Sequence, residues 1–244
     1  MAKRNIILKS GVNILLIMEI FKNINIVDLA LKYRDILIIG DLHLGFEESL
    51  IKEGVLIPFS QFKKTIKKLE EIIKKTKPDK IIINGDVKDD FGSITRQEWK
   101  ETLDFIDFLK NKAELIFIKG NHDTILEPIA KKKDIKVLER YDIDDITVIH
   151  GDKLFKDLKK TVIISHEHPA ISFKERRDEK YKCFLKGKYK KHNLIVLPSF
   201  NLLIQGSDIL NEEFLSPYIK NINNFEVFVV QDKVYDFGKV KNIQ

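Results

Sequence analysis

Apolar residues along the chain gather in short runs, and the stretches between the first of these runs carry apolar residues at a longer, helix-like spacing. The short runs are rich in isoleucine and valine, which is typical of strands buried on both faces of a sheet. We therefore predict strands over Ile36–Ile39, Lys80–Ile83, Leu115–Ile118, Ile146–Ile149 and Thr161–Ile164.

Two of the intervening stretches predict helices. The first covers residues 59–73, with Pro58 suited to the first helical turn and Pro78 just beyond the expected end. In the second, Thr95 and Glu98 have the spacing of a capping box ahead of Trp99 and the apolar residues that follow it. The first half of the chain is therefore predicted to have the order β-α-β-α-β.

Strand-like runs dominate after residue 135, where the helical pattern fades. These later runs cover Lys182–Leu185, Leu194–Leu197 and Val227–Val230. The chain contains no internal repeat, and no segment rich in glycine, serine or proline marks a linker. A single α/β domain over residues 1–244 is the simplest interpretation.

The composition fits a globular domain and excludes several other classes of protein. Of the 244 residues, 43% are hydrophobic and 33% are charged, which suits a chain that buries a sizeable core. The single cysteine, Cys183, excludes an intramolecular disulfide framework and a cysteine-based zinc site, and we expect it to be a small buried apolar residue. The longest apolar candidate for a leader or a membrane helix, Val12–Phe21, is interrupted by Asn13 and Glu19. We therefore predict a soluble, cytoplasmic protein.

The net formal charge of +6 arises within one segment. Residues 174–191 contain nine basic and three acidic residues, which accounts for the whole excess. Two interpretations stay open, a solvated lysine-rich loop or a surface that binds a phosphate-rich partner. The abundance of lysine, glutamate and isoleucine is typical of a thermophile, although an AT-rich genome produces a similar bias.

Polar residues with metal-binding chemistry follow the ends of five predicted strands. Ligands of α/β proteins bind beyond the carboxyl ends of the strands, so we expect one rim of the sheet to collect these side chains. One histidine beside an apolar run is commonly a structural residue, but five such coincidences are hard to explain in that way. His192, which lies among lysines, is instead expected in a surface loop. The candidate residues are Asp41, His43, Asp86, Asn121, His122, Asp123, His150, His166 and His168.

The donor set suits divalent manganese, iron, zinc, cobalt or nickel, because it combines carboxylates and imidazoles without thiolates. All candidates except His122 and Asp123 are potential ligands; they are too many for one tetrahedral ion and suffice for two ions that share a carboxylate. Two divalent cations carry four positive charges, of which Asp41 and Asp86 neutralise two. The remaining charge is expected to lower the pKa of a bridging water and to attract a phosphate oxygen, as in in-line phosphoryl displacement.

Five short motifs within residues 36–170 carry these residues. They are Asp41-Leu42-His43, Gly85-Asp86, Gly120-Asn121-His122-Asp123, His150-Gly151 and Ser165-His166-Glu167-His168. In this order the motifs resemble those of the calcineurin-like metallophosphoesterases. The resemblance implies an α/β fold in which a pair of packed mixed sheets is flanked by helices. It also implies an enzyme that hydrolyses phosphoesters with two divalent metal ions, manganese foremost and nickel, cobalt, iron, zinc or magnesium as alternatives.

The resemblance further implies a role for each residue. His122 would face the substrate, where it would stabilise the transition state or protonate the leaving oxygen, and Asp123 would orient it. Asp86 would bridge the two ions. The remaining ligands would be Asp41, His43 and His168 for one ion, and Asn121, His150 and His166 for the other.

Two details refine the resemblance. The last motif usually begins with glycine, and because Ser165 stands there, the backbone before His166 is expected to be less free than in the family. Four segments are similar to the branch that contains the ligase-associated DNA-damage-response endonucleases and their archaeal relatives. These segments are Asp41-Leu42-His43-Leu44-Gly45, His166-Glu167-His168-Pro169, Cys183-Phe184-Leu185 and Leu197-Pro198-Ser199-Phe200.

Three functions follow as hypotheses. The leading one is a two-metal phosphodiesterase that acts on nucleic acid, either DNA or RNA. For that substrate, residues 174–191 are expected to start near the metal rim, and Lys186, Lys188, Lys190 and Lys191 to bind its phosphates. The second is a phosphomonoesterase with the same metal core, acting on a nucleotide, a metabolite or a phosphoprotein. The third is a non-catalytic scaffold, against which the complete set of ligands and His122 argue.

Overall fold

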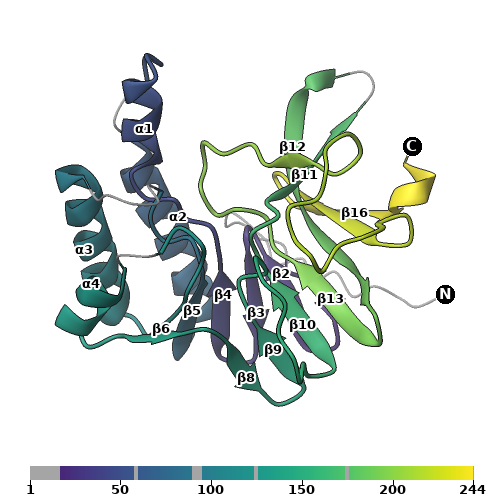
Figure 1. Ribbon diagram of the computed structural model, residues 1–244, viewed down its shortest axis with the longest axis horizontal. Coiled ribbons are helices and arrows are strands. Elements are labelled where there is room, and N and C mark those ends of the chain that lie inside the picture. The colour runs from purple at the N-terminus through teal and green to yellow at the C-terminus, as the bar shows by residue number, and fades with distance from the viewer. Residues whose placement is uncertain (1–16, 58–59, 90–94, 124–125, 174–175, 244) are drawn as a thin grey trace.

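The computed structural model describes residues 17–57, 60–89, 95–123, 126–173 and 176–243. Two β-sheets face each other across a shared apolar core, and helices flank the first sheet (Figure 1). The predicted α/β fold class, a pair of packed mixed sheets flanked by helices, is confirmed. No helix within the described ranges is long and apolar enough to span a membrane.

The first sheet has seven strands in sequence order. Its first four strands are antiparallel, and β4 to β7 are parallel neighbours. The strands are β1 (Ile17–Phe21), β2 (Ile24–Val27), β3 (Ala30–Tyr33), β4 (Ile36–Ile39), β5 (Lys80–Asn84), β6 (Glu114–Ile118) and β7 (Lys136–Leu138).

Among the described residues, four helices accompany this sheet, and they are α1 (Phe46–Lys52), α2 (Gln61–Thr76), α3 (Arg96–Lys110) and α4 (Leu126–Lys132). The predicted capping box of α3 is confirmed, since Thr95 Oγ1 accepts from Glu98 N at 3.0 Å and Glu98 Oε2 accepts from Thr95 N at 3.4 Å. α2 begins at Gln61, so Pro58 precedes it and lies outside the described residues.

The second sheet has nine strands and mixed direction. Its centre consists of β9, β10 and β13, which run parallel, and of the long strand β12, which is antiparallel to β13. The strands are β8 (Tyr141–Ile143), β9 (Ile146–Val148), β10 (Thr161–Ile164), β11 (Pro169–Phe173), β12 (Arg176–Tyr189), β13 (His192–Val196), β14 (Ser207–Asp208), β15 (Glu226–Val230) and β16 (Val234–Lys239). A 3-10 helix, η1 (Val240–Asn242), follows β16.

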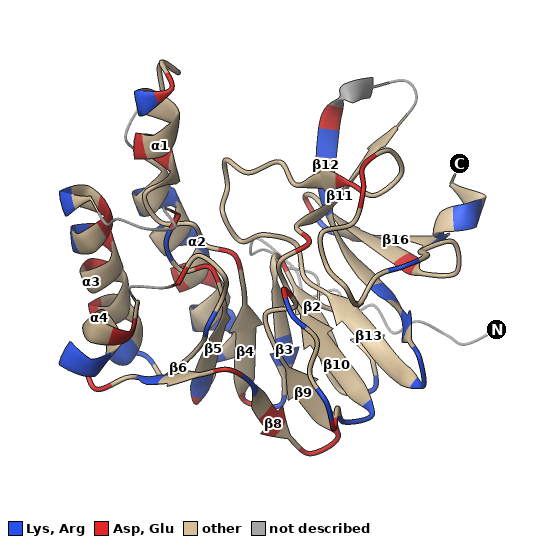
Figure 2. Ribbon diagram, in the orientation of Figure 1, with Lys and Arg blue, Asp and Glu red and all other residues tan. Residues whose placement is uncertain are grey.

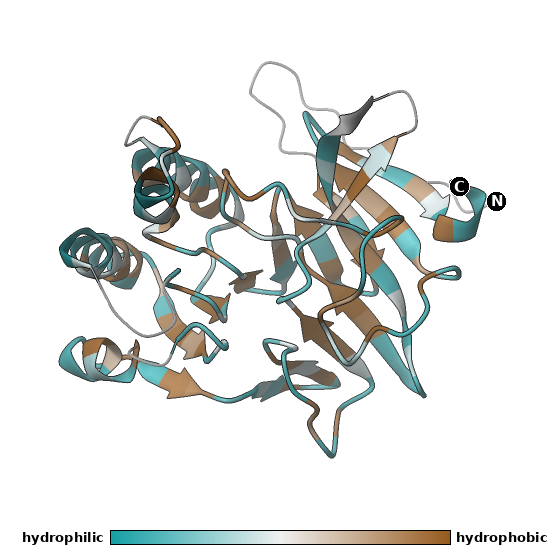
Figure 3. Ribbon diagram, turned by 45° about the horizontal axis from the view of Figure 1, so that its top comes forward, coloured by the Kyte–Doolittle hydropathy of each residue, from teal (hydrophilic) through white to brown (hydrophobic). Residues whose placement is uncertain are grey.

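The second sheet is buried on both faces, which explains its uninterrupted apolar runs. Along β10, Ile163 joins the core shared with the first sheet, whereas Val162 and Ile164 face the opposite side. That opposite side is covered by irregular chain from Ile209 to Phe225 rather than by a long helix. Figure 3 shows how the apolar residues gather on the strands.

Of the basic segment 174–191, residues 176–189 form strand β12, so the interpretation of the segment as a solvated loop is corrected. Lys180 pairs with Glu212 at 2.5 Å, and Lys186 pairs with Glu226 at 2.9 Å. The register of β12 against β13 places Leu185 opposite Val196, and Tyr189 opposite His192.

Because Val196 is also level with the end of β10, the lysines after Leu185 run away from the rim that carries the candidate ligands. The lysines that were predicted to bind the phosphates of the substrate, Lys186, Lys188, Lys190 and Lys191, therefore lie away from this rim. The start of the segment, residues 174–175, which was predicted to lie near the rim, is outside the described residues. Figure 2 shows basic residues at this far end of the second sheet.

Two single residues complete the comparison with the sequence. Cys183 is free and fully buried, and burial raises the pKa of its thiol, so the prediction of a small buried apolar residue is confirmed. His192 does not lie in a loop. It begins β13, is partly exposed, and its Nδ1 lies 2.6 Å from Lys159 O.

Candidate metal centre

The candidate ligands come from loops at the carboxyl ends of strands in both sheets. Asp41 and His43 follow β4, Asp86 follows β5 and Asn121 follows β6, whereas His150 follows β9 and the pair His166 and His168 follows β10. The candidate ligands do meet at one rim, as expected. This rim is formed by two facing sheets rather than by one. The packing of the sheets therefore completes the site.

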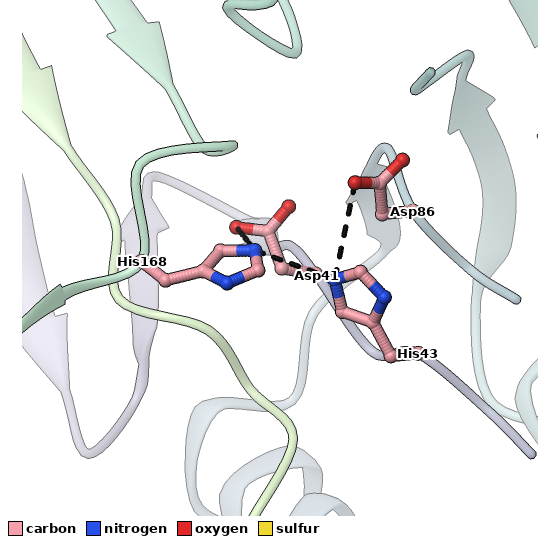
Figure 4. A group of neighbouring side chains, drawn as sticks. All are labelled: Asp41, His43, Asp86 and His168. Carbon is pink, nitrogen blue, oxygen red and sulfur yellow. Dashed lines mark hydrogen bonds and ion pairs between the residues drawn. The ribbon is translucent and has the colours of Figure 1, made fainter. Parts of the chain in front are cut away.

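The first group of donors contains Asp41, His43, Asp86 and His168, whose nearest ligand atoms all lie within 4.8 Å of one another. Figure 4 shows the four side chains pointing toward a common centre. His43 Nε2 lies 3.3 Å from His168 Nε2 and 3.8 Å from Asp86 Oδ2, and His168 Nε2 lies 3.4 Å from Asp41 Oδ2. Two imidazole nitrogens and two carboxylates that converge in this way fit a divalent cation.

The second group contains Asp86, His150 and His166. His150 Nε2 lies 3.3 Å from Asp86 Oδ2 and 3.0 Å from Asn121 Oδ1, which brings the amide of Asn121 to the same group. Asp86 therefore belongs to both groups, as a shared carboxylate must. These donors are also oxygen and nitrogen atoms, so a second divalent cation fits them equally well.

The backbone is strained at most of these residues. Asp41, His43, Asp86, His166 and His168 all have left-handed φ angles, between 43° and 68°. A non-glycine residue in an unfavourable backbone region costs of order 1–3 kcal/mol and persists only where its surroundings enforce it. Concentration of such residues in one place marks a functional site built against local preference.

Orientation of the imidazole rings depends on hydrogen bonds behind them. Asn84 O lies 3.2 Å from His150 Nδ1, so a proton on Nδ1 leaves Nε2 free toward the donor group. Asp89 Oδ1 lies 3.4 Å from His43 Nδ1, an ion pair when that ring is charged. Asp89 is itself held by Ser49 Oγ at 2.6 Å, and its N–H donates to Glu98 Oε1 at 2.9 Å.

Asp89 was not among the sequence candidates. Its signal was its place three residues after Asp86, in the loop that follows the same strand. Glu98 was found only as a helix cap, and the structure adds its contact with Asp89.

Burial and charge shift the pKa values of the site in opposite directions. Burial disfavours the charged ring of His150, yet the hydrogen bond and charge of Asp86 and the charge of Asp41 outweigh it and raise the pKa of His150 to about 9. Burial also opposes ionisation of Asp86, but His150 and the neighbouring histidines hold its pKa well below the usual range. Burial lowers the pKa values of His122 and His166.

Asp123, which the resemblance implies orients the ring of His122, makes its hydrogen bonds with backbone groups of the loops around that ring. Asp123 is fully buried, and its carboxylate accepts from Val87 N at 3.0 Å and from Gly120 N at 2.9 Å. Burial, with the charge of Asp86, raises its pKa to about 6. The ring of His122 instead places Nδ1 against Asp89 O. Asp123 therefore fixes the backbone of the loop rather than the imidazole.

Ser165 is accommodated without a left-handed backbone, because the positive φ angle falls on His166, at 68°. Ser165 Oγ accepts from Asn84 Nδ2 at 3.0 Å and thereby links the two sheets. The room for this hydroxyl comes from Gly40, where an added Cβ would lie 2.0 Å from Ser165 Oγ. The departure from the family motif is compensated by this close approach.

Comparison with known proteins gives a family match and similar solved structures. A family model described as "Calcineurin-like phosphoesterase" matches residues 34–230. The chain is similar to the crystal structure of Pseudomonas putida nuclease MPE, with a TM-score of 0.65 and 17% identity over 88% of this chain and 94% of that one.

Two further solved structures give lower TM-scores. The Escherichia coli phosphoesterase Yfce gives a TM-score of 0.42 and 9% identity over 80% of this chain and 87% of that one. Protein AQ665 of unknown function from Aquifex aeolicus gives a TM-score of 0.39 and 17% identity over 55% of this chain and 78% of that one. No curated protein matches the sequence.

Proposed function

The chain belongs to the calcineurin-like phosphoesterase family, and from this membership we propose that it is a phosphodiesterase that uses two divalent metal ions to cleave nucleic acid. The observation that carries the proposal is the position of Asp86, which both donor groups share. Its Oδ2 lies 3.8 Å from His43 Nε2 and 3.3 Å from His150 Nε2, between the two sets of imidazoles. A carboxylate that bridges two ions needs this placement.

We propose that the remaining ligands divide between the two ions along the same two donor groups. When bound, the pair of ions polarises a phosphate oxygen and lowers the pKa of a water molecule. We take manganese as the first candidate, because mixed carboxylate, amide and imidazole donors suit it, with nickel, cobalt, iron, zinc or magnesium as alternatives. The proposed ligands besides Asp86 are Asp41, His43 and His168 for one ion, and Asn121, His150 and His166 for the other.

His122 is the group that we propose to act on the substrate. Its ring centroid lies 4.9 Å from that of His43, and its side chain keeps 17% exposure, so it borders the first group and faces solvent. Because Nδ1 lies against the carbonyl of Asp89 and holds its proton there, Nε2 is the nitrogen left to exchange a proton with the leaving oxygen, and the ring donates that proton from its imidazolium form. Asp123 supports this role indirectly, through the backbone of the loop that carries His122.

Nucleic acid is the proposed substrate class on two grounds. The Pseudomonas putida protein whose fold this chain shares is named a nuclease. The segments around Asp41, His166, Cys183 and Leu197 are similar to the endonuclease branch of the family. The lysines of β12 that follow Leu185 do not contribute to this argument, since they run away from the rim.

A reconstitution screen tests the proposal. Metal-stripped protein is supplied with each candidate ion and assayed on bis-p-nitrophenyl phosphate, p-nitrophenyl phosphate, single-stranded DNA and RNA. We expect turnover of the diesters and of nucleic acid with manganese, and none in an Asp86→Ala preparation purified in parallel. Preference for the monoester p-nitrophenyl phosphate would show that the protein is a phosphomonoesterase instead. Inactivity with every ion would favour the hypothesis of a non-catalytic scaffold.

A further inference from the structure

The turn that carries Asp41 and His43 is held from two sides. On one side its N–H groups donate to the loop after β5, Asp41 N to Gly85 O at 3.1 Å and His43 N to Asp86 O at 2.9 Å. This contact joins the two first-sheet loops that contribute to the first donor group. The buried carbonyl groups of the turn need donors of their own.

Those donors come from residues 199–201, in the chain that follows β13 of the second sheet. Phe200 N donates to Gly40 O at 2.9 Å. Asp41 O accepts from Ser199 Oγ at 2.7 Å and from Asn201 N at 3.3 Å. Asn201 Nδ2 then donates to Leu42 O at 2.8 Å and to His43 O at 3.1 Å. Each carbonyl from residue 40 to residue 43 therefore has a partner in this short segment.

The amide of Asn201 is used completely. Besides the two bonds from Nδ2, its Oδ1 accepts from Leu203 N at 2.8 Å and from Ile204 N at 3.3 Å, and the residue is only 7% exposed. From strand β12, Lys182 Nζ donates to Ser199 O at 2.7 Å and to Asn201 O. The segment is thus anchored to β12 while it holds the turn.

We propose that Asn201 is a positioning residue. It forces Asp41 and His43 into the left-handed backbone that aims their side chains at the first metal ion, and Lys182 anchors the segment that carries it. The φ angles of 54° and 43° at these residues require such enforcement, because neither conformation is favoured locally. The inference rests on the proposed metal centre, and it assigns to the second sheet the task of shaping a ligand turn of the first.

The proposal is specific for the amide donors. Asparagine offers two N–H groups to the two carbonyls, and aspartate of the same shape offers none and would repel them. Asn201→Asp and Asn201→Ala are therefore expected to have the same effect on the turn. Asn193→Ala is the matched control, because Asn193 is 8% exposed and donates to Thr161 Oγ1 at 3.3 Å at the far end of the same sheet.

Two measurements test the proposal. Amide hydrogen exchange of the metal-free protein should rise about tenfold or more at Asp41, His43 and Leu44 in both Asn201 variants and stay unchanged in the control. Calorimetric titration with manganese should show the affinity of one ion falling roughly 10–100-fold, as for outer-shell partners in general, with the other ion unaffected. If Asn201 had a merely structural role, its replacement would lower the affinity of both ions alike.

The outcomes also separate this inference from the proposed function. Unchanged exchange at the turn, or equal weakening of both ions, would overturn the positioning role. Wild-type protein that binds no metal would overturn the proposed function, while the exchange experiment would still report on the turn. If the Asn201 variants fail to fold, Lys182→Met is compared with Lys186→Met, its neighbour on the same strand that pairs with Glu226, and only the former should raise the exchange.

Discussion

Metal binding at the second donor group should depend steeply on pH, because His150 holds a proton in the metal-free protein. Its ring is 1% exposed, and burial alone would lower its pKa. Asp86 Oδ2, 3.3 Å from Nε2, and the charge of Asp41 stabilise the imidazolium more strongly, so the pKa rises to about 9. A cation needs the neutral ring, and it must therefore displace this proton.

The magnitude follows from the distance between pH 7 and this pKa. Two pH units below the pKa of His150, the apparent affinity of the ion is reduced about 100-fold, or by about 3 kcal/mol at 1.36 kcal/mol per unit. Because His150 loses its proton as the pH rises, the apparent affinity of the ion increases about tenfold per pH unit from pH 7 to pH 9 and then levels off. His166 adds nothing to this slope, because burial lowers its pKa and leaves it neutral in that range.

Calorimetry in buffers with different ionisation heats measures the effect directly. At pH 7 we expect the metal-free protein to release about one proton from His150 when manganese binds. His43, whose pKa is also raised against burial by Asp89 and Asp86, adds to this release. His150→Gln should remove about one proton from this count. Binding that releases no protons, with an affinity that stays constant between pH 7 and pH 8.5, would refute the reasoning.

Three further predictions concern single residues. Asp86→Ala should cost both ions in a metal analysis of the purified protein, because both groups share this carboxylate; retention of one ion would show that it is not shared. His122→Ala should keep the metal content of the wild type while turnover falls roughly 10²–10⁴-fold, the usual contribution of a positioned acid or base, and loss of metal would instead identify His122 as a ligand. Thr95→Ala should destabilise the protein by about 1 kcal/mol in urea unfolding, since Thr95 Oγ1 caps α3; an unchanged free energy of unfolding would contradict that role.

The spacing of apolar residues and the capping residues at helix ends were sufficient to predict the strands and helices that carry the site. The predicted strands over Ile36–Ile39 and Thr161–Ile164 are β4 and β10 without change of bounds, and the capping box locates the start of α3. These features are local, because the alternation of burial and the first turn of a helix depend on residues close in sequence. The order of polar residues after the strand ends predicted the donors for the same reason.

Elements without such signals were missed. The meander β1 to β3 turns through Asn23 and Asp28, whose φ angles are 62° and 56°, so the glycine that usually marks a hairpin is absent there. Helix α1 has seven residues and no side-chain cap at Gly45. A short helix of this kind is stabilised by its packing, which the local pattern does not encode.

By itself, the sequence determined which residues offer metal-binding atoms and after which strands they come. Only the tertiary structure decided that two facing sheets share the rim, that Asp89 rather than Asp123 meets the ring of His122, and that Asn201 holds the turn of Asp41. Asn201 lies 159 residues from Leu42, whose carbonyl it binds. The reason is physical, since strand formation follows from neighbouring residues, whereas the hydrogen bonds that aim a side chain come from chain that folding brings there from far away.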